Sequence, residues 1–72
     1  MFRTIDRLLP LLQSYYLETH NHPDKVDREG YVELVALLDR AVGRCGDTLP
    51  PKVVADLRSI VARNQAVLAE AA

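Results

Sequence analysis

Residues 51–69 read PKVVADLRSIVARNQAVLA, and this stretch does most to decide the fold class. Its apolar residues recur at alternating spacings of four and three, which places them along one side of an α-helix. One seam position holds an amide instead, and a lone amide in an apolar seam often fixes the register or the number of associating helices. The predicted seam consists of Val53, Leu57, Ile60, Asn64, Val67 and Ala71.

Two further helices are predicted upstream, over residues 4–19 and 28–45. The middle helix has clear boundary signals, because Asp27 can bond its first free amides and Gly46 follows its last turn. In the N-terminal helix, Pro10 removes a backbone hydrogen bond and crowds the carbonyl four residues earlier. Pro10 therefore either kinks this helix or opens the main helix after a separate turn, and we expect the kink.

The expected fold is all-α, because no alternation typical of β-strands appears in the sequence. We predict one domain over residues 1–72, a compact three-helix protein with a kinked N-terminal helix, a middle helix and a heptad-like C-terminal helix. A chain of 72 residues buries only about 60% of its unfolded surface on folding. Since a second copy would bury more apolar surface, we expect a helical homodimer. The seam over residues 51–69 could face either its own chain or another.

The composition is that of a globular protein with almost balanced charge. Nine basic residues stand against ten acidic ones, which gives a formal net charge of −1. A nucleic-acid-binding chain usually carries a basic excess, so nucleic acid is not the expected partner. No apolar run approaches the roughly 18 residues that span a bilayer, and the N-terminal residues do not resemble a signal peptide. With Cys45 as the single cysteine, we expect a cytoplasmic protein that does not contact a membrane.

No residue pattern predicts catalysis or a bound cofactor. His20, His22 and Asp24 place nitrogen and oxygen ligands close together, so metal binding through the His20/His22 loop is a remote alternative. One loop does not preform a metal site, and the glycines are too scattered for a phosphate-binding loop. We therefore expect no metal, no cofactor and no enzymatic activity.

A small DNA-binding transcriptional regulator is the closer alternative, because three-helix proteins often place one helix in the major groove. Against it, Asp56 lies on the same surface, and the paired prolines at residues 50–51 do not resemble a helix-turn-helix connection. The polar residues that could face DNA are Lys52, Arg58, Ser59, Arg63 and Gln65, with Arg40 and Arg44 from the middle helix.

The leading hypothesis is a non-enzymatic protein-protein interaction module. Tyr15 and Tyr16 are adjacent, and neighbouring helix residues point about 100° apart, so both cannot lie equally deep in one core. One of the two tyrosines therefore adds apolar surface outside the core, and we expect a partner to bury that surface. The chain would bind another protein and regulate or sequester it, as an inhibitor, adaptor or chaperone does, and would act as a homodimer. The predicted interface residues are Leu11, Tyr15, Tyr16, Tyr31, Val53, Leu57, Ile60, Asn64 and Val67.

Overall fold

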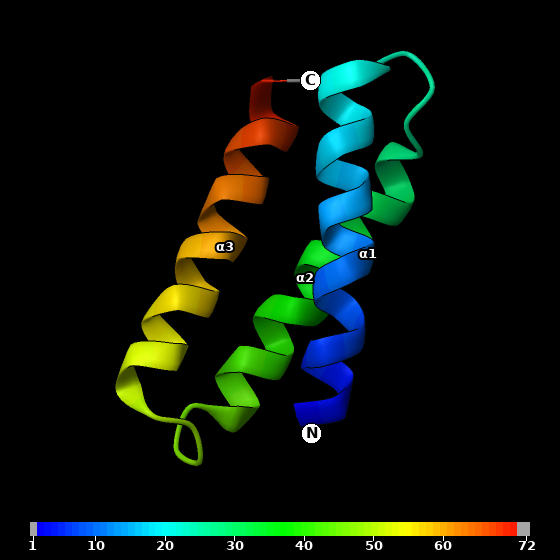
Figure 1. Ribbon diagram of the computed structural model, residues 1–72. Coiled ribbons are helices and arrows are strands. Elements are labelled where there is room, and N and C mark those ends of the chain that lie inside the picture. The colour runs from blue at the N-terminus through cyan, green and yellow to red at the C-terminus, as the bar shows by residue number, and fades with distance from the viewer. Residues whose placement is uncertain (1, 71–72) are drawn as a thin grey trace.

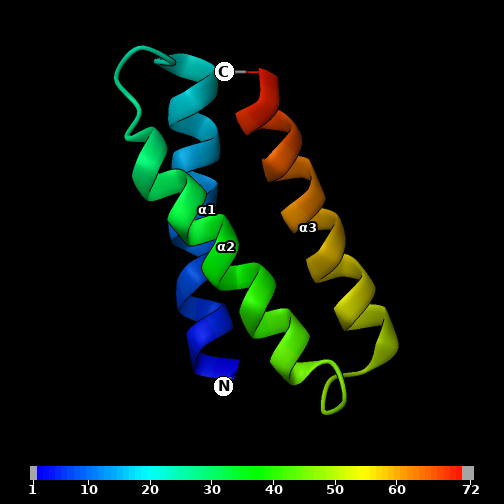
Figure 2. The same cartoon turned by 180° about the vertical axis from the view of Figure 1, so that it is seen from behind.

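Three α-helices joined by two short loops make up the structure, a computed structural model that describes the backbone of residues 2–70 and the side chains of residues 5–70. Helix α1 spans Phe2–Asn21, α2 spans Arg28–Cys45 and α3 spans Pro51–Glu70. No strand occurs in this part of the chain, so the predicted all-α class is confirmed. Helices α1 and α3 run in the same direction and α2 runs in the opposite one, as Figure 1 and the reverse view in Figure 2 show.

The helix boundaries follow local signals in the sequence. Helix α2 begins after Asp27, whose side chain accepts a hydrogen bond from the Gly30 amide at 3.1 Å. Helix α3 begins at Pro51, a residue tolerated there because the first helical amides have no partner within the helix. Helix α1 extends two residues beyond the predicted range at each end. Local signals therefore place the helices, and only the ends of α1 differ clearly from the prediction.

Pro10 lies inside α1, so residues 2–21 form one helix and the alternative in which Pro10 opens the main helix is wrong. Because proline has no amide hydrogen, the carbonyl of Asp6 loses its usual helical donor. Both Asp6 and Pro10 are exposed, so water can reach that part of the backbone. The Ser14 hydroxyl donates a hydrogen bond to the Pro10 carbonyl at 3.1 Å. The proline is tolerated because the carbonyl that loses its donor, that of Asp6, lies on the solvent side of the helix.

Helix α2 is central to the core, and α1 and α3 each contact it more extensively than they contact each other. Tyr31, Leu38 and Val42 of α2 are completely buried. This arrangement leaves the edges of α1 and α3 apart on one side of the bundle. The buried side chains of the three helices are Ile5, Leu12 and Thr19 on α1, Tyr31, Leu34, Val35, Leu38, Val42 and Cys45 on α2, and Leu57, Val61 and Asn64 on α3.

Candidate interaction surfaces

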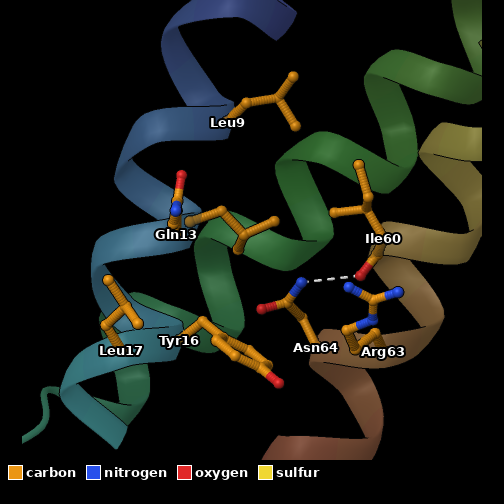
Figure 3. Close-up of a pocket in the computed structure, with 8 residues that line it drawn as sticks. Leu9, Gln13, Tyr16, Leu17, Ile60, Arg63 and Asn64 are labelled. Atoms are coloured by element: carbon orange, nitrogen blue, oxygen red, sulfur yellow. Dashed lines mark hydrogen bonds between the residues drawn. The ribbon is translucent and has the colours of Figure 1, made fainter.

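A groove of about 380 Å³ lies between α1 and α3, with α2 behind it (Figure 3). The groove is open because α1 and α3 contact each other little and are held together mainly through α2. Its lining is mostly apolar, with two amides, one guanidinium and the Tyr16 hydroxyl as polar groups. The lining residues are Leu9, Leu12, Gln13, Tyr16 and Leu17 from α1 and Ile60, Arg63 and Asn64 from α3.

Asn64 forms the buried polar part of this groove and is only 4% exposed. Its amide oxygen accepts a hydrogen bond from the Tyr31 hydroxyl, and its amide nitrogen donates to the Ile60 carbonyl at 2.7 Å. Burial raises the pKa of Tyr31 above its ordinary value of 10.0, and electrostatic repulsion from Tyr16 adds a smaller rise. The amide that interrupts the apolar seam therefore bonds within its own chain and ties α3 to α2.

Tyr15 and Tyr16 lie on different sides of α1, although both are half-buried. The Tyr15 ring stacks on Tyr31 of α2, with ring centroids 5.3 Å apart and planes inclined by 11°. Tyr16 lines the groove and meets the His20 ring edge-on, with centroids 4.6 Å apart. Tyr15 thus packs with the core, whereas Tyr16 belongs to the groove wall.

A second apolar surface lies on the other edge of α1, against α2, and is called the α1/α2 patch below. It surrounds a hollow of about 220 Å³. Leu11 follows Leu8 by one helical turn on this edge and is 54% exposed, while Leu37 is 46% exposed. Within the described part of the chain, Arg40 and Arg44 form no ion pair. The patch comprises Leu8, Leu37, Arg40, Ala41 and Arg44 around the hollow. Helical spacing places Leu11 beside it, next to Leu8.

The residues predicted for an interface are divided between the core and the two surfaces. Tyr31, Leu57 and Asn64 are buried against their own chain. Leu11 alone among the predicted residues is exposed, and it lies beside the α1/α2 patch. The predicted residues that are half-buried are Tyr15, Tyr16, Val53, Ile60 and Val67.

The groove brings three of the predicted residues together, namely Tyr16, Ile60 and Asn64. Sequence reasoning missed the part of its wall formed by the outer edge of α1, where Leu17 is 50% exposed. Leu9 and Leu17 stand four residues before and after Gln13, so the sequence holds a minor stripe beside the core stripe of α1. Only the position of α3 shows that this stripe faces a groove.

The structure does not bring together the residues considered for metal binding or for DNA binding. Among the residues that the structure describes, no three His, Cys, Asp or Glu side chains are close enough to hold a metal ion. Arg58 and Arg63 are both exposed, but their separation along α3 places them about 140° apart around the helix. No helix in the described ranges combines the length and apolarity needed to cross a membrane.

Comparison of the chain with protein-family models, curated proteins and solved structures found no match. The function is therefore inferred from the surfaces described above.

Proposed function

We propose that this chain is a non-enzymatic helical module that binds another protein and regulates or sequesters it, acting as a homodimer in the cytoplasm. The observation that supports this proposal is apolar surface on both edges of α1. Leu17 is 50% exposed beside the groove, and Leu11 is 54% exposed beside the α1/α2 patch. A helix of a self-contained bundle needs one apolar face toward its core. Two further apolar edges favour two contacts, one with a second copy and one with the regulated protein.

The α1/α2 patch is the surface that we assign to the regulated protein. Its leucines supply apolar contact area, and Arg40 and Arg44 form no ion pair with described residues. Charged groups around an apolar contact contribute mainly to orientation and to the choice of partner. The patch therefore suits an apolar segment of another protein that also carries acidic side chains.

The DNA-binding alternative has less support from the same geometry. Its leading arginines, Arg58 and Arg63, do not share one face of α3, and Arg63 borders the apolar groove. A duplex needs several cations on one surface to displace its counterions. A protein partner accounts better for arginines that flank exposed leucines.

The test compares two equally exposed apolar residues on different faces of α2. Leu37 and Val32 are both 46% exposed and lie about 140° apart around the helix. An affinity-tagged chain should capture a specific protein from extracts of cells that produce it, and Leu37→Glu should abolish this capture. Val32→Glu should retain it, with the circular dichroism of both variants unchanged. Equal capture by the two variants would refute the α1/α2 patch as the contact, and no capture by the wild type would refute the proposed function.

A further inference from the structure

The molecule has more accessible surface than a compact monomer of its mass. Its accessible surface is 5119 Å², whereas folded monomers of 8.1 kDa expose about 4,500 Å². The excess of about 600 Å² approaches the roughly 800 Å² that each partner buries in an interface of standard size. The elongated bundle, 38 × 20 × 16 Å, therefore has accessible surface available for contact with a second chain.

The residues on the outer edge of α1 are spaced symmetrically about Gln13. Leu9 and Leu17 each stand four residues from Gln13, and Asp6 and His20 each stand seven residues from it. At 100° per residue, these five positions fall within an arc of about 80°, so they share one edge of the helix. Leu9 is half-buried and the other four residues are exposed. This edge is therefore one continuous surface with Gln13 at its centre.

Such a surface is complementary to itself when two helices pack antiparallel. A twofold axis at Gln13 places Leu9 of one chain opposite Leu17 of the other, and Gln13 opposite its own copy. It also places the Asp6 carboxylate opposite the His20 imidazole at both ends of the contact, and an imidazole N–H can donate a hydrogen bond to a carboxylate. Apolar groups then meet apolar groups, and a donor meets an acceptor.

We propose that a second copy of this chain occupies the groove, with the two α1 helices antiparallel about a twofold axis at Gln13. The inference rests on the homodimer of the proposed function and specifies its interface. Ile60 of α3 adds apolar area to the groove wall, and Arg63 forms no ion pair within the described part of the chain. Antiparallel α1 helices and the two flanking α3 helices then form a four-helix interface whose centre is closed to water.

A cysteine placed on the twofold axis tests this register directly. Residues at the axis of an antiparallel helix pair face their own copies closely enough for a disulfide. Under mild oxidation, Gln13→Cys should form a covalent dimer of the full chain, detected by non-reducing gel electrophoresis. Glu18→Cys is the matched control, because Glu18 is also exposed but lies about 140° around α1 from Gln13. It should remain monomeric on the gel, as should the wild type, whose Cys45 is buried.

The strength of the dimer is tested with the two exposed leucines of α1. Leu17→Glu should raise the dimer dissociation constant at least tenfold in sedimentation equilibrium, whereas Leu11→Glu should leave it unchanged. Circular dichroism of both variants should match the wild type, because both leucines are about half exposed.

The outcomes separate this interface from the proposed function. A wild-type dimer that persists in Leu17→Glu and does not link through Gln13→Cys would refute the α1 interface and leave the homodimer standing. A wild type that is monomeric at every concentration would refute both the interface and the homodimer. Protein capture through Leu37 is measured independently of either result.

Discussion

At the scale of single residues, Tyr31 connects the three helices. Its hydroxyl donates to Asn64 on α3, its ring stacks on Tyr15 of α1, and its own side chain is completely buried on α2. A buried hydroxyl is destabilising unless it has a hydrogen-bond partner. Asn64 supplies that partner, and Tyr31 in turn satisfies the buried amide oxygen. The pair therefore acts as one unit in the packing of α2 against α3.

Removing either half of this pair should destabilise the fold. Tyr31→Phe should lower the free energy of unfolding by about 1–3 kcal/mol, because the buried amide oxygen of Asn64 loses its donor. Asn64→Leu should lower it by a similar amount, because the Tyr31 hydroxyl loses its acceptor. The variant carrying both substitutions should lose less than the sum of the two, as measured by urea denaturation. Strict additivity would contradict a direct coupling between the two side chains.

The buried hydroxyl of Tyr31 also predicts a loss of stability in alkali. The unfolded chain releases this proton near pH 10, whereas burial raises the pKa of Tyr31 in the folded chain, with a smaller contribution from Tyr16. Above about pH 10 the unfolded state therefore binds fewer protons than the folded state, and the free energy of unfolding falls as the pH rises. The decline ends once the pH exceeds the folded-state pKa. Tyr31→Phe should show a shallower decline than the wild type in urea titrations across this range, and equal slopes would contradict the assignment.

At the scale of the elements, α2 determines how the other two helices are placed. Its N-terminus is fixed by the Asp27 side chain, and the buried face that follows packs against both α1 and α3. Two glycines on this helix have opposite surroundings. A Cβ atom at Gly30 would lie 2.5 Å from Asp27 Oδ2 and 2.6 Å from the Tyr15 hydroxyl, whereas one at Gly43 would meet nothing within 4 Å. A side chain at position 30 thus requires the Asp27 carboxylate and the Tyr15 hydroxyl to shift, whereas one at position 43 does not.

These surroundings predict different results for the same substitution. Gly43→Ala should raise the free energy of unfolding by about 0.5–1 kcal/mol, because alanine favours helix and restricts the unfolded chain. Gly30→Ala should gain less than this or destabilise the fold, because the helix cap and the Tyr15 hydroxyl must both move. Thermal unfolding of the two variants, followed by circular dichroism, provides the comparison. An equal gain at both positions would show that the contacts around position 30 do not hinder the methyl group of the substituted alanine.

At the scale of the whole molecule, α1 and α3 both pack on α2 and leave a groove between them. The chain has extents of 38 × 20 × 16 Å, so a large part of each helix remains near the surface. Exposed leucines on both edges of α1 follow from this arrangement. We assign one edge to a second copy and the other to the regulated protein. Leu17→Glu and Leu11→Glu should therefore separate dimerisation from partner capture in otherwise similar proteins.

The sequence by itself determined the helices. Periodic apolar residues, the cap at Asp27 and the position of Pro51 placed α2 and α3 to within one residue, because each signal acts within a few residues along the chain. The same signals were weaker in α1, where Pro10 left open a kinked helix or a separate first turn, and the structure has one helix through Pro10. Local rules identified Asn64 as unusual but could not identify its partner.

Tertiary structure alone decided what the helix faces contact. Tyr31 lies 33 positions before Asn64, and only the packing of α2 on α3 brings the two side chains into contact. The weak stripe through Gln13 became a groove wall for the same reason, because α3 packs on α2 and stands apart from the outer edge of α1. Periodicity in a sequence shows that a helix has an apolar side. Which neighbour covers that side depends on the packing of segments far apart in the chain, and local propensities contain no information about it.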